Sequence, residues 1–100
     1  MLREYFKRYK ILQRENQELI DKTNFKYCDV SIKQLVPSDM ILSKDMIISI
    51  VTKKKHIKEH LYEITIQAIL KPSYKLTFEC DDNYRFTKIY LPGMCITKFS

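Results

Sequence analysis

The sequence has 100 residues, of which 45% are hydrophobic and 30% are charged, a balance typical of one small globular domain and not of a disordered chain. Its single glycine, Gly93, excludes the glycine-rich loops that bind phosphate or a dinucleotide. Lysine and arginine outnumber aspartate and glutamate by 18 to 12, and the resulting net charge of +6 favours anionic partners.

The first predicted element is a helix over residues 2–22. Large side chains recur there at alternating steps of three and four: Leu2, Tyr5, Tyr9, Leu12, Asn16 and Leu19. One interpretation is an amphipathic helix that lies on the protein's own sheet. The other is a seam between two copies of the chain, in which Asn16 fixes the register of the pair.

The charges of this helix oppose its dipole. The first half of the helix is basic, whereas Glu15, Glu18 and Asp21 lie in its second half. Negative charges are normally favourable near the N-terminus of a helix and positive charges near its C-terminus. An antiparallel copy of the helix would offset this arrangement, and so would a bound anion.

After Asn24 the apolar residues recur with a period of two, which predicts strands. The predicted strands cover residues 25–35, 45–53 and 61–70, with a fourth strand from Tyr74 and a short last strand at 94–99. Turns are predicted at 37–39, 71–73 and 92–93, and a polar connector at 53–60. Residues 81–83 are either a hairpin turn or a bulge in one long strand.

The order of these elements defines the fold class. The sequence predicts an α+β fold in a single domain over residues 1–100. An N-terminal amphipathic helix within 1–22 is followed by an antiparallel sheet of four to six strands within 25–99.

Both faces of the predicted sheet hold apolar residues. On the second strand, Met46, Ile48 and Ile50 are in phase on the more apolar face. The opposite face holds four large apolar side chains: Ile47, Val51, Leu61 and Ile69. Such side chains need a cover, which is the protein's own helix, a second copy of the chain or a bound polypeptide. We therefore take these four as the predicted contact residues for a polypeptide partner.

One stretch resembles a known family. The segment from Asp45 to Leu70, DMIISIVTKKKHIKEHLYEITIQAIL, resembles the central part of the SecB-like chaperone family, whose corresponding strand opens with a run like Leu61-Tyr62-Glu63-Ile64. Downstream, residues 76–80 and 84–89 are similar to the last long strand of that family, and the resemblance covers about residues 25–90. It implies a sheet that pairs with copies of itself and binds unfolded or partner chains. The chain departs from the family in its basic charge and in the helix that precedes its sheet.

Two classes of function follow. The first is a non-enzymatic, homo-oligomeric protein that binds polypeptide, either an unfolded client or a specific partner, through apolar sheet surface. The second is a small basic nucleic-acid-binding protein, such as one from a mobile element, whose anion-binding residues are Lys53, Lys54, Lys55 and Lys58. A third class, a ligand-binding cone of a helix wrapped by a sheet, fits the order of elements without indicating a ligand.

Residues with catalytic chemistry are few. His56 and His60 lie four apart, as metal ligands on a helix would, but the neighbouring lysines oppose a metal ion. Asp81 and Asp82 are typical of a turn. The sequence therefore predicts no catalytic residue, no metal site and no cofactor.

The expected location is the cytoplasm. The cysteines Cys28, Cys80 and Cys95 form no C-x-x-C pair, which predicts free thiols in a reducing compartment. No apolar run reaches the ~18 residues that cross a bilayer. The charges throughout residues 1–20 argue against a secretory signal peptide.

Overall fold

A computed structural model describes residues 2–90 and, from residue 7 onward, their side chains. The elements in chain order are α1 (Leu2–Lys22), β1 (Lys26–Ser31), the 3-10 helix η1 (Ile32–Gln34), β2 (Met40–Leu42), β3 (Ile48–Lys58), β4 (Leu61–Ala68), β5 (Lys75–Asp81) and β6 (Arg85–Tyr90). The prediction of one N-terminal helix followed by an antiparallel sheet is confirmed. The predicted turn at 92–93, the predicted strand at 94–99 and Cys95 lie outside the described residues.

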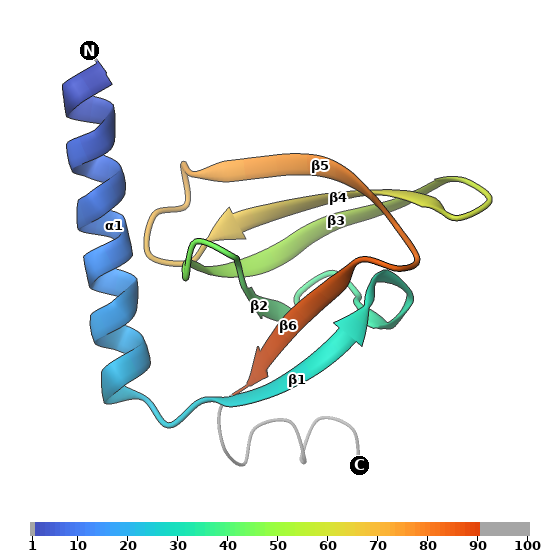
Figure 1. Ribbon diagram of the computed structural model, residues 1–100, viewed down its shortest axis with the longest axis horizontal. Helices are drawn as coiled ribbons and strands as arrows, with labels where there is room; N and C mark the ends of the chain where they lie inside the picture. The colour runs from blue at the N-terminus through green and yellow to red at the C-terminus, as the bar shows by residue number, and fades with distance from the viewer. Residues whose placement is uncertain (1, 91–100) are drawn as a thin grey trace.

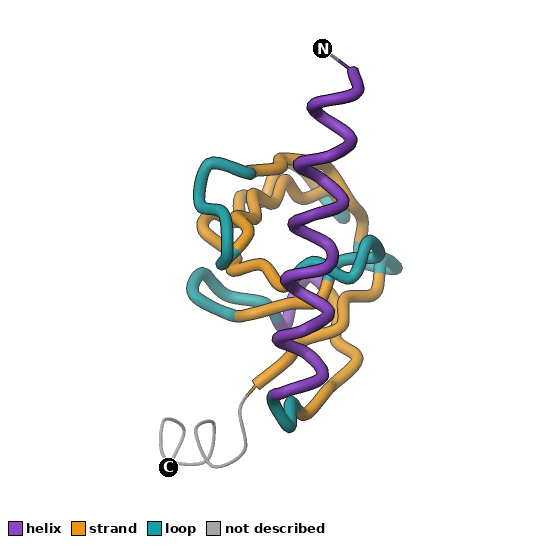
Figure 2. Tube along the Cα trace, turned by 90° about the vertical axis from the view of Figure 1, so that its left-hand side faces the viewer, coloured by secondary structure: helices purple, strands orange, loops and turns teal. Residues whose placement is uncertain are grey.

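The six strands form one sheet in the order β1-β6-β2-β3-β4-β5, and every neighbouring pair is antiparallel (Figure 1). Figure 2 shows the strands curving into a ring behind α1, which runs across one end of the sheet. The outer strands are β1 and β5, so each has one edge that no strand of the described chain pairs. Curling brings the apolar face of the sheet inward and makes that face the core.

The main core lies inside this curve. Val51 on β3 is opposite Ile66 on β4, and Ile66 is opposite Leu76 on β5, so the three side chains share the inner face. The buried members of this cluster are Val30, Ile32, Leu35, Ile41, Val51, Ile64, Ile66, Cys80 and Phe86. They come from all six strands, from η1 and, in the case of Leu35, from the residue that follows η1, so the core joins every strand of the sheet.

The second predicted strand starts later than expected, and residues of both its phases are buried. Residues 43–47 form a loop, in which Met46 has a positive φ of 65°, and β3 begins at Ile48. Val51 belongs to the main core although it was predicted on the less apolar face, while Ile48 is fully buried as predicted and Ile50 is half-buried. The run from Met46 to Val51 is apolar in both phases, so a period of two could not decide which face is buried.

The predicted polar connector at 53–60 is wrong, because residues 53–58 continue β3. They pair with β4 as far as Lys58 opposite Leu61, with register shifts after Val51 and after His56. The reversal at Glu59, which has φ 37°, lacks the Asn-Gly or Gly signature that marks a tight hairpin. An antiparallel ribbon tolerates charged side chains on its solvent faces, so the lysines interrupt no strand.

The boundaries of the other strands agree with the sequence prediction only in part. The first strand ends at Ser31, and η1 replaces its predicted second half. Residues 81–83 form a turn, since the N–H of Asn83 donates to Asp81 Oδ1 at 2.9 Å and the N–H of Tyr84 donates to the Asp81 carbonyl at 3.2 Å. The three-residue strand β2 was not predicted, because so short a segment shows no period.

Candidate functional site

The four predicted contact residues do not form one surface. Ile47 is 1% exposed and packs with Leu12 of α1 and Ala68 of β4, while Val51 is 1% exposed within the main core. Leu61 is half-buried at the start of β4, and Ile69 is 38% exposed just after β4 ends. For Ile47 the cover is the protein's own helix, one of the three covers considered. Ile47 and Val51 are therefore inaccessible to a partner in this fold.

Of the two interpretations of the helix, the described side chains support the one in which it lies on the protein's own sheet, and not the seam. Leu12 and Asn16 are both buried within the chain. Asn16 Oδ1 accepts a hydrogen bond from the N–H of Ile48 at 2.8 Å, and its Nδ2 donates to the carbonyl of Leu12 at 2.7 Å. Leu19 is half-buried, and Tyr9 packs beside Tyr74 at the edge of this cluster. Leu2 and Tyr5 precede the residues whose side chains are described.

A pocket of about 480 Å³ lies on the inner face, lined by residues of β2, β4, β5 and β6 and of the loop between β2 and β3. Its apolar walls are Ile41, Ile66, Leu76, Phe78, Tyr84 and Phe86, and its other lining residues are Leu42, Ser43, Lys44, Asp45, Met46, Arg85 and Thr87. Sequence analysis placed Leu76, Phe78 and Phe86 on strands but did not indicate that the sheet leaves a space between them. We call this pocket, together with the free edge of β5, the β5 site.

Apolar side chains of β5, the outer strand that borders the pocket, are partly exposed. Leu76 is 48% exposed although it is opposite the buried Ile66, and Phe78 is half-buried opposite Ile64. The ring of Phe78 lies 6.3 Å from that of Phe86 and 6.0 Å from that of Tyr84, between centroids. The pocket thus has both aromatic and aliphatic walls.

The predicted anion-binding lysines lie on the β3–β4 hairpin, which extends beyond the other strands in Figure 1. Lys53, Lys55 and Lys58 are exposed, with Lys55 opposite Glu63. Lys54 points the other way and its Nζ donates to the carbonyl of Leu35 at 2.9 Å. The four lysines therefore do not act as one patch, because Lys54 binds the protein itself.

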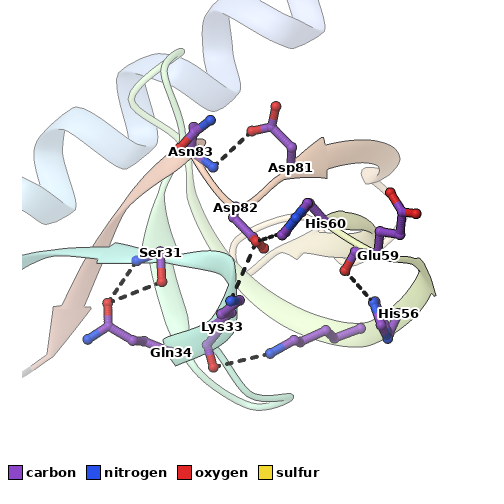
Figure 3. Close-up of polar contacts among 10 residues, drawn as sticks. Ser31, Lys33, Gln34, His56, Glu59, His60, Asp81, Asp82 and Asn83 are labelled. Atoms are coloured by element: carbon purple, nitrogen blue, oxygen red, sulfur yellow. Dashed lines mark hydrogen bonds and ion pairs between the residues drawn. The ribbon is translucent and has the colours of Figure 1, made fainter.

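A polar cluster joins the hairpin tip to the turn between β5 and β6 (Figure 3). Asp82 accepts contacts from His60 Nδ1 at 2.5 Å and from Lys33 Nζ at 3.5 Å. The hydrogen bond to His60, aided by the charge of Lys33, lowers the pKa of Asp82 below its usual range. Nearby, His56 Nε2 contacts the carbonyl of Glu59 at 2.8 Å, and the His56 ring stacks on Tyr62. The contacts of Asp82 join three segments: η1, the tip of the β3–β4 hairpin and the turn between β5 and β6.

Two further observations bear on chemistry. Burial raises the pKa of the Cys80 thiol, so this cysteine stays protonated and is a poor nucleophile near neutral pH. Within the described residues, no group of three or more histidine, cysteine, aspartate or glutamate side chains is placed to hold a metal ion.

Comparison with known proteins does not assign a family. The chain matches no family model, no curated protein and no solved structure. Among residues 2–90, α1 is the only α-helix, and it is not apolar enough to cross a membrane.

Proposed function

We propose that the protein binds an extended segment of another polypeptide at the β5 site. The observation that carries this proposal is the unpaired edge of β5 beside an apolar pocket, whose walls include Leu76 and Phe78 of the same strand. The proposal keeps the polypeptide-binding function that the SecB-like resemblance implies and moves it to different residues. Membership of that family, a homo-oligomeric state and a cytoplasmic location belong to the same proposal.

The mode of binding is strand addition. An extended segment that lies along β5 pairs its backbone with the free N–H and C=O groups of that edge, and its alternate side chains face the pocket. Seating one large apolar side chain there contributes about 1.5–3 kcal/mol. Main-chain pairing provides affinity for many sequences, and the pocket selects those with a large apolar residue in register.

The rim of the pocket indicates the charge of that segment. Lys44 Nζ lies 4.8 Å from the centroid of the Tyr84 ring, and Arg85 Nε donates to Asp29 Oδ2 at 3.2 Å. The charged residues that line the pocket are Lys44, Asp45 and Arg85, whose charges sum to +1, and Asp29 is not among the lining residues. A segment with an acidic residue beside its apolar anchor complements this rim better than a basic one.

The direct test uses a 12-residue synthetic peptide that alternates apolar residues with glutamate, and a second peptide with lysine in place of glutamate. Binding is measured by fluorescence anisotropy, and the backbone amide shifts of residues 75–81 report where the peptide lies. We expect the glutamate peptide to bind more tightly and to shift β5 amides.

Two variants of adjacent residues locate the site. Leu76→Asp places a charge at the pocket and should weaken binding more than tenfold, because burying an unpaired charge costs several kcal/mol. Thr77→Asp puts the same charge on the opposite face of β5 and should bind as the wild type does. Circular dichroism checks that both variants fold. Equal losses in the two variants, or none in either, would contradict the proposal.

A second candidate function is nucleic-acid binding by the β3–β4 hairpin. It is favoured by the exposure of Lys53, Lys55 and Lys58 on a projecting two-stranded ribbon, a shape that fits the major groove of DNA. If the hairpin binds duplex DNA, Lys53→Gln with Lys55→Gln should reduce the slope of log K against log salt by about two. The exposed Lys26 on β1 supplies the control substitution, which should leave the slope unchanged.

A further inference from the structure

A second, smaller cavity of about 220 Å³ lies between α1 and the loop that joins β4 to β5. Its lining consists of Arg8, Tyr9, Leu12, Lys71 and Tyr74, and no carboxylate is among them. We propose that this cavity, the Arg8–Lys71 cavity, binds a small phosphate monoester, with Arg8 and Lys71 as the residues that hold its anionic group. This function is separate from that of the β5 site.

Two positive charges meet at this cavity. Arg8 comes from the helix and Lys71 from a loop more than sixty residues later, yet the fold brings both cations to one cavity. Among the described residues, neither side chain makes an ion pair or a hydrogen bond. Two like charges beside one apolar cavity repel each other, and a bound anion turns that repulsion into attraction.

Both cations are held by ordered backbone. Arg8 and Leu12 are four residues apart, so they lie on the same face of α1, and the burial of Leu12 fixes that face against the sheet. The loop is closed by the N–H of Tyr74, which donates to the carbonyl of Lys71 at 2.8 Å. A site on ordered elements needs little reorganisation when the ligand arrives.

The walls strengthen the attraction. The rings of Tyr9 and Tyr74 lie 6.3 Å apart between centroids and are tilted by 31°, so they form a continuous aromatic wall. Leu12 is buried at its base. These apolar and aromatic walls leave Lys71 half-buried and Arg8 exposed, so the charge of Lys71 is partly shielded from water and interacts more strongly with an anion. They also provide contact for the organic part of a ligand.

Size and charge select the ligand class. Sites for drug-sized molecules have volumes of about 300–1,000 Å³, so this smaller cavity fits an anionic group with a small substituent. A phosphate monoester has a charge of about −1.5 to −2 at pH 7 and three acceptor oxygens, enough to accept from two cations at once. A carboxylate has one charge and two oxygens. The charges of α1 also favour an anionic ligand. Its first half is basic, which opposes the helix dipole, and an anion bound beside that half offsets the unfavourable positive charge.

The experiment is a titration with phenyl phosphate, inorganic phosphate and benzoate at constant ionic strength, followed by amide shifts of the whole chain. Phenyl phosphate should bind at least several-fold more tightly than benzoate, with shifts at Tyr9 and at residues 71–74. Its affinity should fall as the pH drops below about 6, where the ligand loses its second negative charge. Equal binding of benzoate would overturn the phosphate assignment.

Matched variants test the residues. Arg8→Gln and Lys71→Gln should each weaken phenyl phosphate binding about tenfold, the loss typical of one charge-assisted hydrogen bond. Lys7→Gln removes an exposed charge next to Arg8 that does not line the cavity, and it should change the affinity less than twofold. A loss in Lys7→Gln as large as in Arg8→Gln would show diffuse attraction by the helix and overturn the site.

The source of the phosphate is tested separately. A single-stranded DNA 10-mer presents phosphodiesters, which have one charge each. If the 10-mer binds and depends on Arg8 and Lys71 while phenyl phosphate does not bind, the cavity serves nucleic acid and the small-ligand assignment is wrong. Leu76→Asp at the β5 site should leave phenyl phosphate binding unchanged, so failure at one site does not affect the other.

Discussion

The curled sheet is covered by another element on the side of α1 but not on the side of β5. On the α1 side, Leu12 covers Ile47 and Asn16 binds the first N–H of β3, so apolar and polar groups are both satisfied. On the β5 side, Leu76 stays half-exposed beside a pocket and the strand edge is unpaired. The contrast shows that an apolar strand in this protein is buried only where another element reaches it.

The α1 side, which we call the closed side, depends on one polar residue, Asn16. A buried backbone N–H without a partner costs about 1–3 kcal/mol, and the first residue of β3 would have such an N–H without Asn16. The β5 side, which we call the open side, has no comparable residue. We therefore expect substitutions on the closed side to affect stability and those on the open side to affect binding.

The largest contrast is between Ile47 and Leu76. Ile47→Ala should lower the free energy of unfolding by about 2–5 kcal/mol, because it leaves a cavity beneath α1. Leu76→Ala should lower it by about 0.5–1 kcal/mol, because half of that side chain is already in water. Urea unfolding followed by circular dichroism measures both. Similar losses in the two variants would mean that the β5 side is covered in solution.

Asn16→Leu is expected to destabilise the protein by about 1–3 kcal/mol, since leucine cannot accept the hydrogen bond of the Ile48 N–H. The seam interpretation expects the opposite, a more stable protein or a changed oligomer. Thermal unfolding and light scattering distinguish the two. Gln17→Leu, on the exposed side of the same helix, is the control and should have little effect.

A smaller effect should come from acid. The lowered pKa of Asp82 means that its hydrogen bond with His60 and its ion pair with Lys33 stabilise the folded protein at a pH above the unfolded value of 3.8. That stabilisation is lost as the pH falls through 3.8 towards the lower folded value. Asp82→Asn should therefore be less stable than the wild type at pH 6, and the difference should shrink below pH 3.8. A difference that stays constant over this range would show that the negative charge of Asp82 does not contribute to stability.

The smallest expected effect is that of a reducing agent. Cys28 is an exposed free thiol on β1, and Cys80 is a buried free thiol on β5. Dithiothreitol should leave the melting temperature within about 1 °C, because folding needs no disulfide between them. A clear fall in the melting temperature would contradict the expected cytoplasmic location as well.

The sequence by itself was enough to predict the helix, the change of period after Asn24 and the α+β class. These features depend on local periodicity, which neighbouring residues determine. The strand from Leu61 was predicted to within two residues because its polar and apolar residues alternate cleanly, and the buried ones, such as Ile64, face the core. The residues of the run from Met46 to Val51 could not be assigned to faces, because both phases are apolar.

Only the tertiary structure decided which groups meet. Asn16 was a candidate seam residue in one of two interpretations of the helix, and in the fold it binds β3. Lys54 was one of four candidate anion-binding residues, and in the fold it binds the carbonyl of Leu35. Arg8 and Lys71 share a cavity that no spacing along the chain indicates. Periodicity reports which side of an element is apolar, but the curvature of the sheet and the path of the chain determine what that side faces.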